Sequence, residues 1–238
     1  MKKAEKTLIF TATYNEAGNI EKLTSAIFQF APNADLLVVD DNSPDGTGRL
    51  LDSIAKKNKK IHVIHRAGKE GLGTAHLLAM RYAVEKKYDV LITMDADFSH
   101  DPKYLPTMLE LIKKYDFVIG SRYMKGGGLG YGLVRTFISR SANWLSRLLL
   151  SIKLTECTTS YRAFRRDLLE KIMQVQIQSS GYSFFFEMVY VITRLTSNIT
   201  EFPIYFPDRV SGKSKISKSE IFRGLVTLFH LFWRRLFR

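Results

Sequence analysis

The chain has 238 residues, which suits one large domain, or a domain with a short appendage, and supplies enough side chains for a full core. Hydrophobic residues make up 45% and charged residues 25% of it, and these proportions exclude a disordered or fibrous protein. The single cysteine, Cys157, excludes an internal disulfide and is compatible with a reducing compartment. Residues 1–6 lead into a predicted strand without the apolar core of a signal peptide, so we expect exposure to the cytosol.

The net charge of +13 is concentrated in the second half of the chain. Residues 1–120 contain 17 Lys and Arg against 16 Asp and Glu, whereas residues 121–238 contain 19 against 7. This asymmetry predicts that the C-terminal half meets an anionic partner: nucleic acid, a phosphorylated substrate or a membrane surface.

Apolar runs alternate with amphipathic segments through the first half. Strands are predicted over 7–12, 36–39, 61–65, 90–97 and 117–120, the fourth of them ending in Asp95 and Asp97. Helices are predicted from about 17 to 30, through 50–54, over 74–86 and through 109–112. This alternation predicts an α/β fold with a mainly parallel sheet flanked by helices, and a site at the carboxyl ends of the strands.

Asp95 and Asp97 carry the clearest chemical signal. In an extended chain, residues two apart face the same way, so the two carboxylates would lie together. Such a pair is best tolerated around a hard cation such as Mg²⁺, which binds one or two carboxylates and completes its shell with phosphate oxygens and water. One aspartate capping a helix that begins near Pro102 is the alternative, and the position after an apolar strand favours the metal.

Polar residues also follow the other strands of the first half. Tyr14 to Glu16 follow the first strand, Asp40 and Asp41 the second, and Arg66 to Lys69 the third. Because parallel strands end at one edge of a sheet, these residues predict a nucleotide-sized site there.

Two long amphipathic helices are predicted in the second half, over 133–154 and over 221–238. The second has a predicted apolar stripe made of Phe222, Leu225, Val226, Phe229, Phe232, Trp233 and Leu236. Between the two helices we expect a strand or turn over 158–164, a helix over 182–195 and a strand over 199–206. The longest uncharged run of the tail, 224–233, is far shorter than the roughly 20 residues that span a bilayer. Its aromatic and basic residues suit a membrane surface, and docking on the protein body or on a partner is the alternative.

Six ordered stretches of the chain resemble the motifs of family 2 inverting glycosyltransferases, which have the Rossmann-like GT-A fold. They are TYNE (13–16), VDDNSPDGT (39–47), GKEGLGTA (68–75), MDADFSH (94–100), GSRY (120–123) and DR with GKSK (208–215). Within the family the chain is most similar to dolichol-phosphate mannose synthases and related polyprenyl-phosphate sugar transferases. The resemblance implies a GT-A domain over 1–220, with a nucleotide-sugar half (1–120) and an acceptor half (121–220), before an amphipathic basic tail (221–238).

The resemblance also implies roles for individual residues. Nucleotide contacts fall on Ala12, Tyr14, Glu16, Val39, Asp41, Lys69 and Ala96, with Asp40 nearby. The metal ligands are Asp95, Asp97 and Ser99, which would hold Mg²⁺ or Mn²⁺. The residues that would bind the lipid phosphate are Arg122, Arg135 and Ser139. The loop that would close over the donor contains Arg209, Lys213 and Lys215. Asp95, Asp97 and Arg209 are the catalytic residues, while Glu187 matches an acidic position of the family without an assigned role.

The chain departs from the family pattern at a few positions. Ala12 stands where the family usually has proline. Residues 156–162 read ECTTSYR where the family has Asp-x-Thr-Ser-Gly-Tyr-Arg, so Glu156 replaces Asp and Ser160 replaces Gly. We expect the changes at 156 and 160 to alter the geometry of the acceptor side.

The function implied is inverting transfer of mannose from GDP-mannose to dolichyl or polyprenyl phosphate. The enzyme would be peripheral on the cytoplasmic side of a membrane, with a small membrane subunit as a further candidate partner. A lipid monophosphate is already an anionic nucleophile, so this transfer requires no general base.

Two alternatives within the fold stay open: transfer of glucose or an amino sugar from a UDP-sugar to undecaprenyl phosphate, and transfer to a glycan hydroxyl. A nucleic-acid-binding protein would explain the charge. However, basic and aromatic residues do not alternate in a recognisable binding motif, and the carboxylate edge would have no role.

Overall fold

The computed structural model describes residues 5–207 and 218–237, without the side chains of 133–135 and 218–221. Its main strands are β1 (Thr7–Thr13), β2 (Asp35–Asp40), β3 (Ile61–His65), β4 (Val90–Thr93), β5 (Phe117–Ser121), β7 (Arg162–Arg165) and β8 (Ile199–Pro203). They form one seven-stranded sheet in the order β3-β2-β1-β4-β7-β5-β8. The short strands β6 (Gly128–Leu129) and β9 (Tyr205–Phe206) pair separately.

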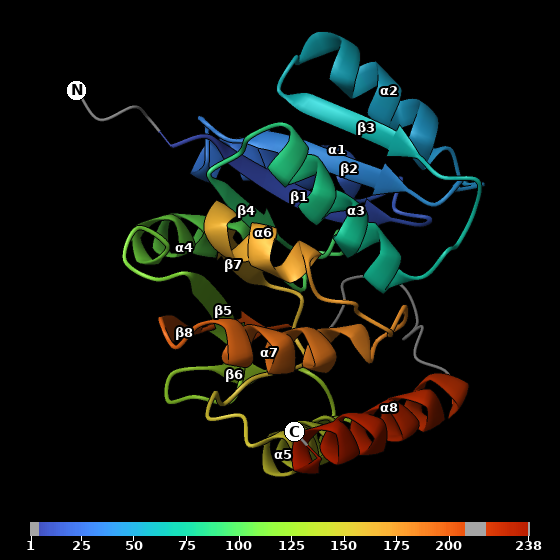
Figure 1. Ribbon diagram of the computed structural model, residues 1–238. Helices are drawn as coiled ribbons and strands as arrows, with labels where there is room; N and C mark the ends of the chain where they lie inside the picture. The colour runs from blue at the N-terminus through green and yellow to red at the C-terminus, as the bar shows by residue number, and fades with distance from the viewer. Residues whose placement is uncertain (1–4, 208–217, 238) are drawn as a thin grey trace.

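Helices cover both faces of this sheet (Figure 1). They are α1 (Ile20–Phe30), α2 (Thr47–Lys57), α3 (Leu72–Glu85), α4 (Leu105–Leu111) after a 3₁₀ turn at Pro102–Tyr104, α5 (Leu133–Leu150), α6 (Arg166–Met173), α7 (Phe184–Leu195) and α8 (Lys218–Leu236). α3, α6 and α7 lie on one face, and α1 and α4 lie on the other (Figure 1). The predicted helix over 133–154 ends at Leu150, where Ser151 adopts a left-handed conformation (φ 52°), and α6 was not predicted.

Alternation along the strands divides the core into two layers. Leu8 and Phe10 of β1 belong to the hydrophobic cluster that contains α3, α6 and α7 residues, while Ile9 belongs to the cluster under α1 and α4. Because a strand directs successive side chains to opposite faces, a strand covered by helices on both sides is buried on both faces, as Leu8, Ile9 and Phe10 of β1 are. This confirms the prediction of a buried, helix-flanked sheet.

β7 is the strand that interrupts the parallel order of the sheet. It pairs antiparallel with both neighbours, Ile92 of β4 and Val118 of β5 facing its Ala163. The segment predicted as a strand or turn over 158–164 therefore enters the centre of the sheet from the edge at which β4 ends. As a result, the residues just before β7 lie at the carboxyl edge, where the candidate site is expected.

The C-terminal helix α8 packs through a narrow face that the predicted stripe did not include. Leu228 and Leu231 are buried in the cluster that contains α7 residues, and Arg235 Nη1 donates to the Leu149 carbonyl at the end of α5 (2.8 Å). The predicted apolar stripe of α8 instead faces outward, with Phe222 and Trp233 more than half exposed. None of the described helices combines the length and low polarity needed to cross a bilayer.

His76 of α3 is buried among the rings of Phe10, Phe184 and Phe185, at centroid distances of 5.0, 5.5 and 5.1 Å. Burial, reinforced by Arg162, lowers the pKa of His76 to about 3. The unfolded chain, with an ordinary histidine pKa of roughly 6.5, then binds a proton that the folded chain excludes, so stability falls as the pH drops below 6.5.

We therefore expect His76→Leu to flatten the acid dependence of folding. Between pH 7 and pH 5 the wild-type free energy of unfolding should fall by about 2 kcal/mol more than that of the variant. Urea denaturation at both pH values measures the difference, and equal slopes for the two proteins would contradict the assignment.

Candidate active site

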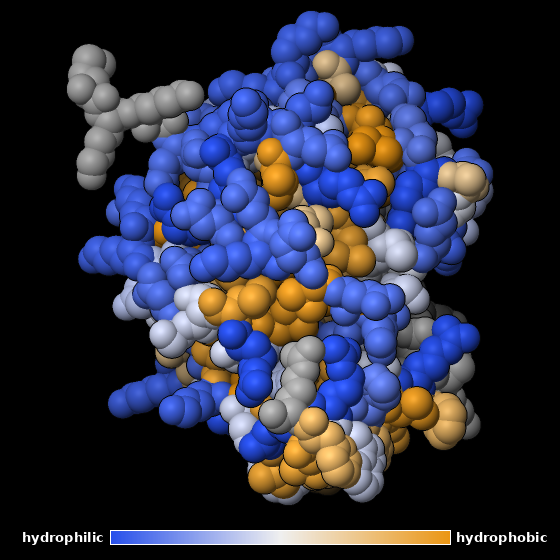
Figure 2. Space-filling view, viewed as in Figure 1, coloured by the Kyte–Doolittle hydropathy of each residue, from blue (hydrophilic) through white to orange (hydrophobic). Residues whose placement is uncertain are grey.

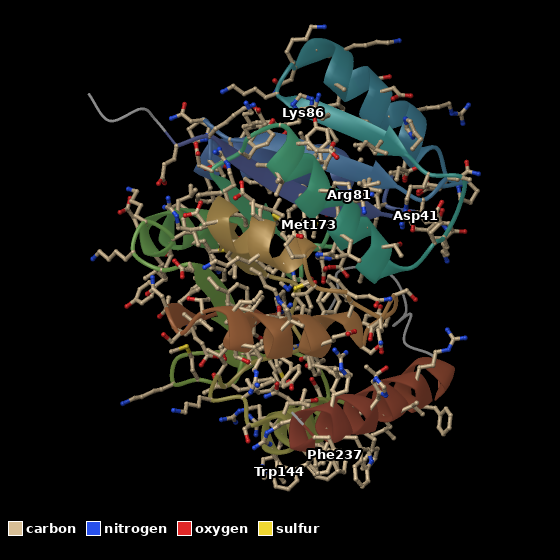
Figure 3. The ribbon with its side chains drawn as sticks, in the orientation of Figure 1. Asp41, Arg81, Lys86, Trp144, Met173 and Phe237 are labelled. Carbon is tan, nitrogen blue, oxygen red and sulfur yellow. The ribbon has the colours of Figure 1, made fainter. Side chains whose placement is uncertain are left out.

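The loops after β1 and β2 are joined to each other by the polar residues of their motifs. Asp40 Oδ1 accepts hydrogen bonds from Thr13 Oγ1 (2.8 Å) and Ser43 Oγ (2.6 Å), and Ser43 Oγ accepts one from the Asn15 amide (3.0 Å). Asp40 is almost completely buried. It therefore orders these loops, while its neighbour Asp41 lies at the carboxyl end of β2 (Figure 3).

A second set of contacts joins the same loops nearer α2. Asp45 Oδ2 accepts the Ala17 amide (3.0 Å), and Thr47 Oγ1 accepts the Glu16 amide (3.0 Å). Hydrogen bonds from Thr47 and from main-chain amides outweigh the opposing effect of burial and lower the pKa of Asp45. Tyr14 and Glu16 are thus presented by a loop that is ordered before any ligand binds.

The predicted nucleotide residues Tyr14, Asp41 and Lys69 come from three loops at this one edge. The Lys69 ammonium lies 3.6 Å from the centroid of the Tyr14 ring. Asp41 Oδ1 accepts a 2.6 Å hydrogen bond from Arg66 Nε, and the Arg66 side chain is only 5% exposed. Burial, opposed by this contact, raises the pKa of Asp41. Arg66, noted in the sequence only as part of a polar cluster, therefore positions Asp41.

Three other predicted nucleotide contacts have small or buried side chains. Val39 is fully buried in the core, Ala96 is nearly so, and Ala12 is half-buried against it. Their roles as nucleotide contacts stay predictions, and at Val39 the side chain points into the core.

Gly71 and Gly73 contact the loop that precedes α7. A Cβ atom at Gly71 would lie 2.7 Å from the Ser180 carbonyl oxygen, and Gly71 has φ +99°. The amide of Gly73 donates to that same oxygen (2.7 Å). Glu187 of α7 accepts hydrogen bonds from the Gln178 amide (3.1 Å) and the Ser179 amide (2.9 Å). The structure thus gives Glu187 a local role: its buried carboxylate shapes the loop that docks on these glycines.

Asp95 and Asp97 were predicted to lie in the extended fourth strand, but both lie beyond its end. β4 ends at Thr93, and the pair lies in a bend in which Phe98 has φ +60°. Each carboxylate is held at Oδ1 by a serine: Ser160 Oγ donates to Asp95 (2.5 Å), while the amide of Ser99 (3.1 Å) and its hydroxyl donate to Asp97. The bend and these serines, rather than strand alternation, place the two acids.

This pair of carboxylates fits a hard divalent cation. Among the described residues, no three His, Cys, Asp or Glu side chains gather in an arrangement that could hold a metal. Two carboxylates suit Mg²⁺ or Mn²⁺ when diphosphate oxygens and water complete the shell. Asp95 and Asp97 would hold such an ion, and Ser99 as a direct ligand stays a prediction.

Arg122, predicted to bind the lipid phosphate, is held in a buried ion pair. Its Nε and Nη2 donate to the two carboxylate oxygens of Glu156 at 2.7 and 3.1 Å, and Nη2 also donates to Thr158 Oγ1 (2.6 Å). Burial disfavours both charges, but their attraction outweighs it, so the pKa of Glu156 is lowered and that of Arg122 is raised. The sequence did not predict this partner, which is 34 residues away.

A second carboxylate, that of Glu201, fixes the main chain at Glu156. Glu201 of β8 accepts the amides of Thr155 (2.7 and 2.9 Å to its two oxygens) and of Glu156 (2.9 Å). Nothing in the local sequence distinguishes Glu201 from the outward polar residue of an ordinary strand. Only the return of the chain across 45 residues reveals its role.

The remaining acceptor and donor-loop predictions are tested only in part. Ser139 of α5 exchanges hydrogen bonds with the hydroxyls of Tyr123 (2.6 Å) and Tyr131 (3.2 Å), close to Arg122. The Arg135 side chain and the predicted donor-loop residues, Arg209, Lys213 and Lys215, lie outside the described part of the chain.

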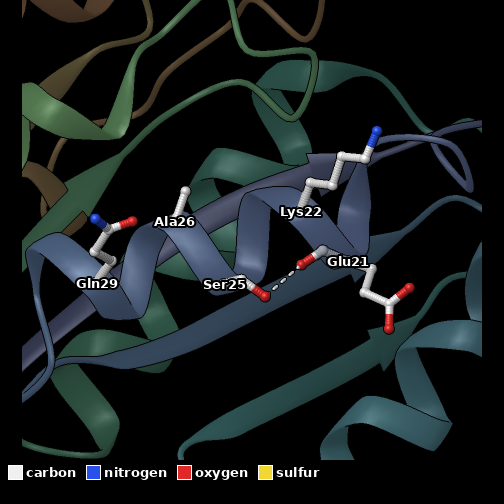
Figure 4. Close-up of a pocket in the computed structure, with 5 residues that line it drawn as sticks. All are labelled: Glu21, Lys22, Ser25, Ala26 and Gln29. Carbon is white, nitrogen blue, oxygen red and sulfur yellow. Dashed lines mark hydrogen bonds between the residues drawn. The ribbon is translucent and has the colours of Figure 1, made fainter.

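A shallow hollow on the outer surface of α1 does not belong to this site. It is lined by residues of that helix alone: Glu21, Lys22, Ser25, Ala26 and Gln29 (Figure 4). Ser25 Oγ donates back to the Glu21 carbonyl (3.0 Å), so even its hydroxyl is used within the helix. Without residues from a second element to enclose a ligand, this hollow does not resemble a binding pocket.

The comparison with known families decides the affiliation. The model of glycosyl transferase family 2 matches residues 8–173, which contain both carboxylates, Arg122 and Glu156. The chain belongs to glycosyl transferase family 2. This family 2 chain is 39% identical over 224 residues to an undecaprenyl-phosphate mannosyltransferase of Micrococcus luteus, covering 94% of this chain and 92% of that protein. It is also 39% identical over 220 residues to a polyprenol monophosphomannose synthase of Mycolicibacterium smegmatis, covering 91% and 83%.

Solved structures confirm the GT-A fold of this family 2 protein. Glucosyl-3-phosphoglycerate synthase from Mycobacterium tuberculosis, in complex with Mn²⁺, UDP and phosphoglyceric acid, superposes with a TM-score of 0.69 at 15% identity, covering 96% of this chain and 79% of that one. A mannosyltransferase from Pyrobaculum calidifontis in complex with GDP-Man and Mn²⁺ has a TM-score of 0.61 at 18% identity, covering 90% and 59%. At these identities the similarity concerns the fold alone.

Proposed function

We propose that this family 2 enzyme transfers mannose from GDP-mannose to a polyprenyl phosphate, such as dolichyl or undecaprenyl phosphate, with inversion at the anomeric carbon. One structural observation carries the proposal: the residues before β7 contact both Asp95 and Arg122, so a carboxylate turn suited to a sugar diphosphate adjoins a buried arginine on the acceptor side. The names of two 39%-identical relatives supply the sugar and the lipid class.

The chemistry requires positioning rather than a general base. A phosphate oxygen of the lipid forms a bond to the sugar C1, the bond from C1 to the donor phosphate breaks, and GDP departs with that electron pair. Mg²⁺ or Mn²⁺, as the Mn²⁺ complexes of structural neighbours suggest, would neutralise the charge that develops on the diphosphate. Asp95 and Asp97 would hold the ion, while Tyr14, Asp41 and Lys69 would bind the nucleoside.

On the acceptor side the chain must recognise a phosphate whose tail stays in lipid. Guanidinium groups match phosphate oxygens, and Arg122 is oriented by Glu156 and Thr158 beside the hydroxyl cluster of Ser139. α5 carries Ser139 on its inner side. The outer side of the same helix would therefore meet the surface from which the lipid phosphate arrives.

That outer side continues onto α8 as one apolar face. Of the twelve large apolar side chains that are exposed among the described residues, eleven belong to this apolar face: Phe137, Ile138, Trp144, Leu148, Phe222, Leu225, Val226, Phe229, Trp233, Leu236 and Phe237. Hydrophobic surface is visible at the lower end of Figure 2, where Figure 1 draws α5 and α8, and Trp144 and Phe237 project away from the sheet in Figure 3. Arg140, Arg223 and Arg234 of the same helices supply positive charge.

We therefore expect α5 and α8 to lie on an anionic membrane surface without crossing it. Phe229→Ser combined with Trp233→Ser should reduce binding to vesicles that contain anionic lipid at least about tenfold, because two buried aromatic contacts with lipid are lost. Vesicle flotation measures this effect. Tyr205→Ser is the matched control, since Tyr205 is 52% exposed, as Phe229 (51%) and Trp233 (55%) are, but lies on β9. An equal loss of vesicle binding in the control would contradict membrane binding through the apolar face. Recruitment by a membrane subunit stays a prediction.

The proposed activity is tested by incubating the full chain with radiolabelled GDP-mannose, a polyprenyl phosphate and Mg²⁺ or Mn²⁺ in detergent. We expect label in the lipid phase, and we expect EDTA to prevent it. Parallel reactions contain UDP-glucose. Label from UDP-glucose alone would overturn the donor and keep the acceptor class, whereas no lipid-linked label from either donor would overturn the proposal.

A further inference from the structure

Residues 155–161 form a strap that precedes β7 and contacts both sides of the site. At one end Glu156 binds Arg122, and at the other Ser160 Oγ donates to Asp95 Oδ1. The carbonyl of Ser160 in turn accepts Thr93 Oγ1 at the end of β4 (2.5 Å). Because β7 is inserted between β4 and β5, the strap is anchored by the sheet itself.

The strap also controls the backbone at Asp95, through His100. The Asp95 amide donates to His100 Nδ1 (2.9 Å), so the ring proton is on Nε2, which donates to Thr159 Oγ1 (3.0 Å). The imidazole stacks on Tyr161, at 4.8 Å between centroids. Ser160 therefore holds the side chain of Asp95 directly, and its neighbour Thr159 supports the main chain of Asp95 through His100.

Ser160 gives Asp95 the same support that Ser99 gives Asp97. Each serine hydroxyl has one proton, and each is directed to Oδ1 of its carboxylate. Ser160 is 3% exposed, so water does not compete for this contact, whereas the Asp95 side chain is 32% exposed. Oδ1 is thus held by a buried hydroxyl, whereas among the described residues Oδ2 of Asp95 accepts no hydrogen bond and lies 3.7 Å from His100 Nδ1, which carries no proton to donate. A glycine at 160, the usual family residue, would leave Asp95 without this contact.

We propose that Ser160 is a positioning residue that fixes Oδ1 of Asp95 and so orients the carboxylate that would hold the divalent cation. The inference rests on the metal role given to Asp95 under the proposed function. Residues that orient a metal ligand through a hydrogen bond typically change metal affinity by about 10–100-fold when they are removed. We expect a loss near the lower limit, because Asp97 keeps its own serine.

The test is a titration of the full chain with Mn²⁺, followed by electron paramagnetic resonance of the free ion, in the presence of GDP and, in a parallel series, UDP. Ser160→Ala and Ser160→Gly should both raise the Mn²⁺ dissociation constant about tenfold. Ser160→Cys keeps a side chain of similar size with a weaker hydrogen-bond donor. Its Mn²⁺ dissociation constant should therefore lie between that of the wild type and those of the other two variants. The matched control is Ser146→Ala, because the buried Ser146 hydroxyl donates only to its own helix, at the Ala142 carbonyl (2.8 Å), and it should leave the constant unchanged.

Misfolding is distinguished by binding of the nucleotide without metal, which these variants should retain. Wild-type Mn²⁺ affinity in Ser160→Ala and Ser160→Gly, together with its loss in Asp97→Ala, would overturn the role of Ser160 and leave the metal site intact. Unchanged affinity in Asp97→Ala as well would overturn the metal site, and the inference with it.

Discussion

Replacing Asp97 with alanine is expected to lower mannosyl transfer at least about 1000-fold while the chain remains folded. The carboxylate lies in a bend outside the strand, with Oδ1 held by Ser99, so its removal deletes a proposed metal ligand without opening a cavity in the core. The loss should fall on kcat, because the proposed cation would stabilise charge that appears as the diphosphate departs. Initial rates with saturating donor and acceptor measure it, and circular dichroism checks the fold.

Asp101→Ala is the matched control for this variant. Asp101 follows the same turn, and its carboxylate pairs with Lys103 (2.9 Å) while its Oδ1 caps the 3₁₀ turn. We expect at most a small loss of stability and near-normal transfer. Wild-type turnover of Asp97→Ala in an assay with excess metal would contradict the assignment of Asp97 as a metal ligand. An equal loss of transfer in Asp101→Ala would indicate damage to the whole turn rather than loss of one ligand.

Replacing Glu156 with glutamine is expected to destabilise the fold by about 3 kcal/mol or more, since it leaves the guanidinium of Arg122 buried without its countercharge. Glutamine keeps the size of the side chain and a carbonyl oxygen for the amides of Thr158 and Thr159, so the change isolates the ion pair. Urea denaturation at neutral pH measures the free energy of unfolding. Transfer should also fall, because Arg122 loses the partner that orients it.

A double-mutant cycle separates the pair from its surroundings. Arg122→Met should cost about as much as Glu156→Gln, because it leaves the carboxylate buried and unpaired, and the double variant should cost clearly less than the two together. Additive costs would contradict a coupled pair. The lowered pKa of Glu156 also sets the direction of the pH dependence. The contribution of Glu156 to the free energy of unfolding is complete above the ordinary carboxylate pKa and is lost as the pH falls through the lower pKa of the folded state.

These predictions connect two of the departures from the family pattern, Glu156 and Ser160. Glu156 and Ser160 stand where the family has Asp and Gly, and each donates or accepts the hydrogen bond that holds a proposed substrate-side residue, Arg122 or Asp95. An effect of Ser160 on metal affinity and of Glu156 on stability would show that one strap serves both the donor and the acceptor.

Much of the donor half was determined by the sequence itself. The strand over 61–65 was predicted at its observed bounds, and those over 7–12, 36–39 and 117–120 to within one residue at each end, because short runs of strand-forming residues bounded by turn formers carry their own local signal. The polar clusters after β1, β2 and β3 were correctly expected at one edge, since parallel strands must end together. Motif residues such as Tyr14 and Lys69 do meet there.

The tertiary structure decided what local pattern cannot encode. The direction of β7, the pairing of Arg122 with Glu156 and the contact of Ser160 with Asp95 join residues 34 to 75 positions apart, and no period of hydrophobicity reports such contacts. The same holds for α8, which has apolar residues on more than one side. Its sequence established an amphipathic helix, but only packing against the body selected Leu228 and Leu231 for burial and left the broader stripe exposed, because burial depends on which surface a neighbouring element covers.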